Sequence, residues 1–335
     1  MGLRRNGCEV LMSDTSSENV ELAQSLVGEV ADQFHPELTI IATPISSLFT
    51  VLKSEFELNP ESWFIDIGGV KTEVIHQVEE FPEIAARFCA THPMAGREFS
   101  GPESAQSDLF EGKAWVLTPT IFSHVRVIEL AREVVQLLGA TTYVLGANEH
   151  DRAVALISHL PQVVSSLLAA QLSEASDAEL EIAGQGIRDT TRLAHSSPEL
   201  WSTLLLSNRE PLIPILEGLQ ADLSEVIESL KGLNDLSIKS LIERGSLGKS
   251  RLPGKHGSKG RNYAFVPVVI DDQPGRLASL FAECAAAEVN VEDLQIEHSP
   301  GQETGLITLA LFPDDAEKLF EHLTKQSWLV QAVRR

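Results

Sequence analysis

The segment Trp63-Phe-Ile-Asp-Ile-Gly-Gly69 joins a short apolar run to a pair of glycines. Three further runs of this kind occur in the first third of the chain, with helical stretches between them: Glu9-Val-Leu-Met12, Leu38-Thr-Ile-Ile-Ala42 and Trp115-Val-Leu-Thr118. Alternating strands and helices are typical of a parallel sheet that is covered by helices, and ligands bind at the carboxyl ends of its strands. We therefore predict an α/β domain over residues 1–148.

The remainder of the chain divides into three parts by composition. Residues 149–244 show long helical periodicity with few strand formers, which predicts a separate all-helical domain. Residues 245–262 collect Gly, Ser, Pro, Lys and Arg, as a flexible linker does. Residues 263–335 follow the order strand, helix, strand, strand, helix, strand, so we predict a small βαββαβ domain at the end.

Composition excludes several classes of protein. The chain of 335 residues has a net charge of −22, which would repel a phosphate backbone, so we predict no nucleic-acid partner. Its three cysteines, Cys8, Cys89 and Cys284, have neither metal-ligand spacing nor an even count, which predicts no metal site and a reducing compartment. No uninterrupted apolar run reaches the roughly 20 residues of a membrane helix. We predict a cytoplasmic protein that does not enter membranes.

His92 is the leading candidate for proton transfer. It follows the apolar run Phe88-Cys-Ala90 and precedes Pro93, which places it just past the end of another strand, on the ligand side of the sheet. An imidazole has an ordinary pKa of about 6.5 and is an effective base near neutral pH. A lone histidine beside a strand is more often structural, so this signal needs support from other residues.

Three clusters together supply that support. They are Thr91-His-Pro-Met-Ala-Gly-Arg-Glu98, then Ser158-His-Leu-Pro161 at an expected helix start, and Gly184-Gln-Gly-Ile-Arg-Asp-Thr-Thr-Arg192 around an expected glycine-rich turn. In this combination the chain resembles the NAD-dependent prephenate/arogenate dehydrogenases over nearly its whole length. The resemblance implies that His92 accepts the proton of the substrate's ring hydroxyl while hydride passes to NAD and carbon dioxide leaves.

The resemblance also assigns substrate-binding residues. His159 and Arg192 match residues that bind the substrate, and a guanidinium suits a carboxylate because it can bind it in bidentate fashion. Glu98 and Asp189 match acidic residues that gate the pocket, and Trp201 matches an aromatic residue that lines it. Two simpler readings stay open: Arg192 as a surface helix charge, and Trp201 as an interface or core residue.

The cofactor region departs from the family pattern. No Gly-x-Gly-x-x-Gly turn is present, and residues 1–7 resemble the tail of the helix that normally follows this turn. Asp14 matches the acidic residue that binds the adenosine ribose of NAD, and Thr43, Pro44 and Gly68 match other cofactor positions. We expect a truncated gene product, a fragment, or a form that has lost its hold on the cofactor, and favour truncation because the downstream clusters are intact.

Two substrate positions also differ from the family. Gly69 stands where many members have a serine that holds the ring hydroxyl, so one hydrogen bond of about 0.5 to 1.5 kcal/mol is in doubt. Gln162 stands where a second histidine is common. A glutamine can still donate and accept hydrogen bonds, but it cannot carry charge.

The last domain resembles an ACT domain, the small module that binds amino acids in regulated biosynthetic enzymes. The turn Asp271-Asp-Gln-Pro-Gly275 carries this resemblance. It implies an amino-acid site, with tyrosine as the expected effector, formed by Asp271, Pro274, Gly275, Leu277, Asn290 and Val291. The alternative is an unliganded dimerisation module of the same fold.

We therefore expect an enzyme that converts prephenate to 4-hydroxyphenylpyruvate with NAD under feedback control by tyrosine. Two alternatives remain: an arogenate dehydrogenase with the same mechanism, and a catalytically silent sensor of amino acids. The helical domain of the family dimerises, and apolar faces around Leu167 and Leu204 are consistent with a homodimer.

Overall fold

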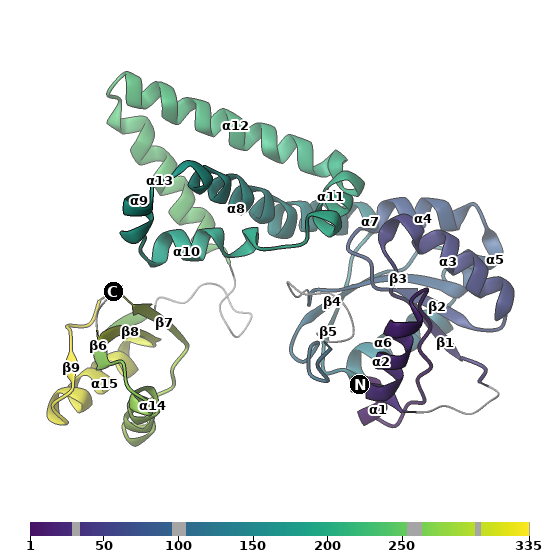
Figure 1. The fold of residues 1–335 in the computed structure, drawn as a ribbon, viewed down its shortest axis with the longest axis horizontal. Helices are drawn as coiled ribbons and strands as arrows, with labels where there is room; N and C mark the ends of the chain where they lie inside the picture. The colour runs from purple at the N-terminus through teal and green to yellow at the C-terminus, as the bar shows by residue number, and fades with distance from the viewer. Residues whose placement is uncertain (29–33, 96–104, 253–262, 299–302, 335) are drawn as a thin grey trace. The chain divides into compact units, whose positions relative to one another are not determined.

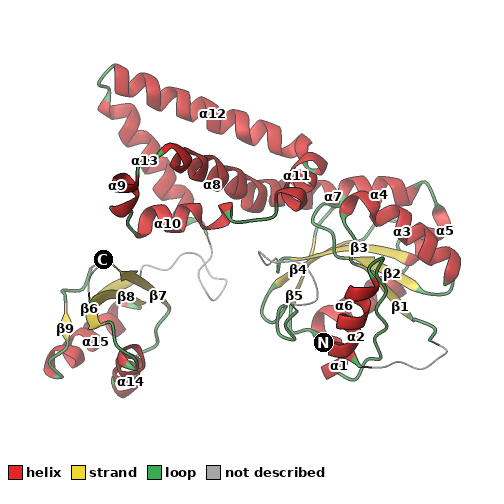
Figure 2. Cartoon of the chain, in the orientation of Figure 1, coloured by secondary structure: helices red, strands yellow, loops and turns green. Residues whose placement is uncertain are grey.

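The computed structural model describes residues 1–28, 34–95, 105–252, 263–298 and 303–334. They form two compact units. The first unit comprises Met1–Ala169 and Arg192–Leu219, and the second comprises Ala170–Thr191 and Gln220–Arg335. Figure 2 shows the helices and strands of both units.

A five-stranded sheet forms the centre of the first unit, in the order β1-β2-β3-β4-β5. Its strands are β1 (Leu38–Ile41), β2 (Trp63–Asp66), β3 (Phe88–Pro93), β4 (Ala114–Thr118) and β5 (Thr141–Val144). Neighbouring strands are parallel except β3 and β4, which are antiparallel, so the prediction of a parallel sheet is correct for three of the four pairs. Each parallel pair is joined through a helix, whereas the described residues between β3 and β4 contain none, and a parallel neighbour needs such a crossover.

Helices cover both faces of this sheet. They are α1 (Gly2–Arg5), α2 (Ser17–Val27), α3 (Ile45–Leu58), α4 (Thr72–Glu79), α5 (Pro82–Arg87) and α6 (Val125–Leu137). Helices α3, α4 and α5 lie on one side and α6 on the other (Figure 1). In β2, Phe64 packs in the first layer and Ile65 in the second, and both are fully buried. Burial on both faces explains why this strand is a continuous apolar run.

The strand expected at residues 9–12 is wrong. These residues have no regular structure, and Leu11 and Met12 are 49% and 40% exposed. A strand requires a hydrogen-bonded neighbour, and among the described residues β1 pairs only with β2. An apolar run of four residues without a partner edge therefore stays irregular.

The region after β5 is one continuous helix, Ala147–Glu174. It consists of α7 (Ala147–Val154), the π-helical turn η2 (Ala155–His159), α8 (Leu160–Gln171) and the 3-10 turn η3 (Leu172–Glu174). Ser158–Pro161 is therefore inside a helix, and the expected helix start there is wrong. Pro161 has no N–H to donate, and the adjoining π turn, in which Leu160 N–H donates to Ala155 O, accommodates the irregularity.

By length and composition alone, this helix is able to cross a membrane. The core helix of a soluble protein meets the same criterion. His150, His159 and Gln162 all lie on it, and each is at most 4% exposed within the protein. These three polar side chains are buried, whereas only 28% of the apolar 18-residue window of the helix is buried in the protein.

The remaining helices confirm the helical character expected from about residue 149. They are α9 (Asp177–Glu181), α10 (Gln185–Thr191), the 3-10 turn η4 (Arg192–Ala194), α11 (Pro198–Ser207), α12 (Arg209–Lys231) and α13 (Asp235–Ser250). The glycine-rich turn expected at Gly184–Arg192 is instead mostly α10, where the Thr190 and Thr191 hydroxyls donate back to carbonyls of the preceding turn. Helix α13 reaches Ser250, so the expected linker begins as helix, and residues 253–262 lie outside the described residues.

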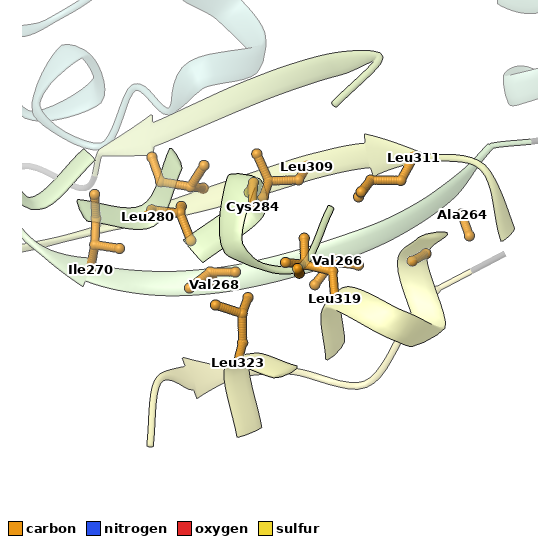
Figure 3. Packing of buried hydrophobic residues seen from close by; sticks show 13 residues of the cluster. Ala264, Val266, Val268, Ile270, Leu280, Cys284, Leu309, Leu311, Leu319 and Leu323 are labelled. Atoms are coloured by element: carbon orange, nitrogen blue, oxygen red, sulfur yellow. The ribbon is translucent and has the colours of Figure 1, made fainter. Parts of the chain in front are cut away.

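Residues 264–330 have the predicted βαββαβ order. The elements are β6 (Ala264–Asp271), α14 (Arg276–Ala286), β7 (Asp293–His298), β8 (Thr304–Leu311), α15 (Pro313–Lys325) and β9 (Leu329–Val330). The sheet order is β7-β8-β6-β9 and every pair is antiparallel, which is a ferredoxin-like arrangement. Alternate residues of β6 and β8 pack with both helices to form one core (Figure 3). Strand β9 has only two residues, and one further bridge pairs Phe265 with Arg334.

Candidate active site

The carboxyl ends of β1, β2 and β3 meet at one edge of the sheet because these strands are parallel. This edge carries Thr43 after β1, the pair Gly68-Gly69 after β2, and His92 near the end of β3. His92 was expected just past a strand end but lies within β3, paired with Val116 of β4. The antiparallel partner extends β3 as far as Pro93.

His92 belongs to a chain of hydrogen bonds that ends at a buried carboxylate. Its Nδ1 lies 2.8 Å from Nε2 of His150, and His150 Nδ1 lies 2.8 Å from Oδ1 of Asp151. The carboxylate only accepts, so His150 carries its proton on Nδ1 and must accept at Nε2. His92 therefore carries its proton on Nδ1, and its Nε2 is left with a free lone pair.

The carboxylate of Asp151 is held in place by the start of α4. Lys71 N–H donates to its Oδ1 at 2.9 Å and Thr72 N–H donates to its Oδ2 at 2.8 Å. Burial alone would raise the pKa of Asp151, but the hydrogen bonds from His150, Thr72 and Lys71 outweigh burial and lower it. Asp151 is therefore ionised at neutral pH and fixes the orientation of His150.

The imidazole of His92 is neutral at neutral pH. Burial lowers its pKa well below the ordinary value of 6.5, and the positive charge of Lys71 and the two neighbouring histidines lower it further, while Asp151 opposes the shift. A neutral imidazole with an unprotonated Nε2 can accept a proton from a ligand. Among the described residues, Nε2 has no hydrogen-bond partner that would compete.

Gly69 lies directly beside this nitrogen. A β-carbon on Gly69 would lie 3.9 Å from Nε2 of His92 but only 3.0 Å from Cδ2 of Leu204 on α11. The glycine thus contributes backbone only, and the space next to the base is bounded by an apolar side chain. A serine in this position would require Leu204 to move.

His159 and Trp201 lie together in the same unit. Their rings are perpendicular, with centroids 6.0 Å apart. Nδ1 of His159 is 3.0 Å from the amide nitrogen of Asn208, which also donates to the carbonyl of Asp151 at 2.9 Å. Burial lowers the pKa of His159 to about 4, so this ring is also neutral, with its proton on Nε2. Asn208 thereby connects the second histidine to the Asp151 chain.

Arg192 opens the turn η4, where its side chain is exposed. The neighbouring backbone is fixed by Gln162, whose Nε2 donates to Leu193 O at 2.8 Å. Ser196 Oγ donates to the same carbonyl at 2.7 Å. The amide of Gln162 is thus engaged with the turn that carries Arg192.

Of the two acidic residues assigned to gating, the structure describes one. Asp189 lies on α10, where its Oδ1 accepts a hydrogen bond from Gln185 at 2.7 Å. Glu98 lies outside the described residues.

The residues at the end of β1 fit a dinucleotide cofactor. The hydroxyl of Thr43 is buried without a hydrogen-bond partner in the described structure, and α3 starts at Ile45 with Pro44 as an N-cap that provides no side-chain hydrogen bond. Free N–H groups at a helix start bind anions such as phosphate. Gly68 is packed so closely that a β-carbon would lie 2.9 Å from Oδ2 of Asp66. Asp14 is exposed, and its carboxylate accepts from Ser16 N–H at 2.8 Å.

Sequence reasoning missed four residues of this site: Lys71, His150, Asp151 and Asn208. A signal was present for the middle pair, because adjacent His and Asp in a largely apolar helix are rarely buried without a partner. Their link to His92 spans 58 positions in the sequence and appears only in the folded chain.

The residues assigned to an effector site lie at two turns of the βαββαβ region or next to them. Asp271, Pro274 and Gly275 form the β6–α14 turn, where Gly275 has a φ of +88° that favours glycine. Asn290 precedes β7 and donates to Glu292 at 2.7 Å. Leu277 and Val291 pack against the hydrophobic core, so their side chains stabilise the fold.

A helix-covered sheet with an unpartnered threonine, a free helix start and a neutral histidine at its carboxyl edge is the arrangement that a nucleotide-dependent dehydrogenase requires. Comparison with known proteins agrees with this class of enzyme. Residues 2–144 match the model of the prephenate dehydrogenase nucleotide-binding domain, and residues 146–242 match that of the prephenate dehydrogenase dimerization domain. A probable prephenate dehydrogenase of Streptomyces niveus is 31% identical over 98% of this chain and 94% of its own length. The chain belongs to the prephenate dehydrogenase family and is an NAD-dependent oxidoreductase.

Solved structures are similar as well. Prephenate dehydrogenase from A. aeolicus, in complex with hydroxyphenyl propionate and NAD+, has a TM-score of 0.65 and 25% identity, covering 74% of this chain and 91% of that one. Arogenate dehydrogenase from Synechocystis has a TM-score of 0.61 and 26% identity, covering 74% and 92%.

Proposed function

We propose that this chain converts prephenate to 4-hydroxyphenylpyruvate by NAD-dependent oxidative decarboxylation. The observation that carries the proposal is the neutral imidazole of His92, held by His150 with its Nε2 free, at the carboxyl edge of a nucleotide-binding sheet. A base of this kind suits the removal of a hydroxyl proton as the hydroxyl-bearing carbon is oxidised.

In the proposed mechanism, Nε2 of His92 takes the proton of the ring hydroxyl. Hydride leaves the same ring carbon, and NAD, when bound, supplies its acceptor. The bond to the ring carboxylate then breaks, carbon dioxide leaves, and the electron pair of that bond completes the aromatic ring. The phenolic oxygen recovers a proton from the His92 imidazolium, which Asp151 stabilises through His150 in the meantime. Atoms and charge balance over the cycle.

Substrate binding is assigned to residues around the base. Arg192 binds a carboxylate of prephenate, and His159 donates a hydrogen bond from Nε2, with Trp201 beside it. Gly69 leaves room for the ring hydroxyl next to His92. Glu98 and Asp189 are proposed to control entry to the pocket.

The cofactor is proposed to contact four positions. Thr43, with its unpartnered hydroxyl, and the helix start at Pro44 lie beside it, Gly68 allows close approach, and Asp14 binds the adenosine ribose. An isothermal titration of the purified chain with NAD tests this arrangement. Binding at micromolar concentration supports it and contradicts loss of the cofactor site.

The decisive experiment measures NADH formation with prephenate and, in parallel, with arogenate. Similarity to the Synechocystis arogenate dehydrogenase makes arogenate the second candidate, with its amino group in place of the keto oxygen. Reduction of NAD with prephenate as the preferred substrate is the expected result. Activity with neither substrate, in protein that binds NAD, would refute the enzyme proposal and favour an amino-acid sensor.

Regulation by an amino acid is proposed for residues 263–335. The βαββαβ order and the turn from Asp271 to Gly275 support an ACT domain, with tyrosine as effector. Tyrosine should inhibit the enzyme and raise its melting temperature. Neither effect at millimolar tyrosine would refute this part of the proposal.

A soluble, cytoplasmic homodimer is proposed as the active form. The match to a dimerization domain over residues 146–242 supports the dimer, and so do exposed leucines on α12 such as Leu223, at 58% exposure. Light scattering after gel filtration tests the assembly. A monomer at micromolar concentration would contradict it.

A further inference from the structure

Lys71 is an ion buried beside the proposed base but without a role in the proposed chemistry. Its ammonium group donates to Oδ2 of Asp66, and both side chains are fully removed from solvent. A buried ion pair is weak evidence for stability, because desolvation offsets much of its attraction. The pair is therefore better explained by what it holds in place.

The pair holds Thr91, the residue directly before His92, from two sides. Asp66 Oδ1 accepts from Thr91 N–H at 2.9 Å, and the Lys71 ammonium donates to Thr91 O at 2.7 Å. Thr91 O belongs to the peptide that leads into His92. The backbone orientation of the base is thus fixed by the two charged groups.

The backbone of the same lysine contacts the hydrogen-bond chain that ends at Nδ1 of His92. Its backbone N–H donates to Asp151 Oδ1 at 2.9 Å, the oxygen that accepts from His150 Nδ1. Lys71 therefore contacts the backbone on one side of His92 and the hydrogen-bond chain on the other.

We propose that Lys71 is a positioning residue for the proton transfer: its side chain orients the His92 backbone, and its backbone N–H orients Asp151. This inference rests on the proposed function of His92 as a base. The charged or titratable groups around His92 are Lys71, His150, His159 and Asp151, with Asp66 paired to the lysine. Lys71 and the two histidines lower the pKa of His92, and Asp151 raises it.

Removing the ammonium removes a charge that opposes protonation, so the pKa of His92 should rise. The acidic limb of the kcat/KM profile should then move to higher pH. Loss of orientation should separately lower kcat, by roughly 10- to 100-fold, with little change in the KM for prephenate.

The test compares Lys71→Met with the double variant Asp66→Asn, Lys71→Met. Lys71→Met leaves the buried carboxylate of Asp66 without its partner, which can prevent this variant from folding. In the double variant neither charge is left, while the amide oxygen introduced by Asp66→Asn can still accept from Thr91 N–H. Lys113→Met, at an exposed lysine of the same unit, is the control. Calorimetric NAD binding verifies the fold of each.

Kinetic measurement of kcat is the first readout, and a second readout does not depend on the substrate. The His92 ring is titrated by NMR in histidine-labelled protein, with its signal assigned from His92→Asn. A raised pKa in the double variant, with kcat lowered at least about tenfold, supports the proposal even if arogenate proves to be the substrate. Wild-type kcat together with an unchanged titration would overturn it. If neither variant folds, the Lys71–Asp66 ion pair serves stability, and this result would also overturn the proposal.

Discussion

Nδ1 of His92 lies 2.8 Å from Nε2 of His150, and this contact leaves Nε2 as the nitrogen of His92 that carries a lone pair. Because Asp151 fixes the proton of His150 on Nδ1, the proton of His92 must also lie on Nδ1. A carboxylate that does not touch His92 thus sets the position of its ring proton through an intervening histidine.

His92→Asn should lower kcat by several orders of magnitude while leaving KM for prephenate nearly unchanged. Asparagine has similar polarity and shape at the ring position but cannot accept the proton. Steady-state kinetics at neutral pH measure both constants. A KM that rises in proportion to the fall in kcat would assign His92 to binding.

Asp151→Asn should lower kcat by roughly 10²- to 10⁴-fold without unfolding the protein. An amide that donates to His150 Nδ1 reverses the chain of hydrogen bonds and places a proton on Nε2 of His92, where the base must be free. His150→Gln interrupts the chain and should also lower kcat. Activity of Asp151→Asn within about threefold of wild type would contradict the tautomer assignment.

The pH profile of kcat/KM should have its acidic limb below the ordinary histidine pKa of about 6.5. Burial lowers the pKa of His92, so the base stays unprotonated as the pH falls through the ordinary range of histidine. Rate measurements from about pH 5 to 8 with constant ionic strength check this. A limb above about pH 7 would mean that the ring is protonated more easily than the buried site implies.

Gln162→Leu should raise KM with a smaller effect on kcat. The leucine is similar in size but cannot donate to Leu193 O, so the turn that starts with Arg192 loses a fixed contact. Arg192→Ala should raise KM further, because it removes the proposed carboxylate ligand itself. If Arg192→Ala leaves KM unchanged, the arginine is a surface charge and does not bind substrate.

Stability should fall as the pH decreases from 6.5, the ordinary pKa of histidine, towards about 4. The pKa of His159 is lowered to about 4 in the folded chain by burial, so the unfolded chain binds a proton in this range while the folded chain does not. The contribution of His159 to stability is therefore complete above the ordinary pKa and is lost progressively below it. Thermal melting across this range measures the loss, and His159→Gln should reduce its slope.

The sequence alone determined the alternation of strands and helices, because buried strands are short apolar runs and surface helices have a repeat of about 3.6 residues. It also made His92, His159 and Arg192 candidates for the site, since these residue types occur in segments with a distinctive order. The βαββαβ order after residue 263 could likewise be read from local patterns. None of these conclusions needs a contact between distant residues.

The tertiary structure decided what depends on such contacts. The run at residues 9–12 has the composition of a strand but no partner edge, and β3 extends through His92 because β4 runs beside it in the opposite direction. Lys71, His150 and Asp151 became part of the site only when α4 and α7 were brought against β3. Hydrogen bonds and burial set the protonation state of His92, and both arise from residues that are far apart along the chain.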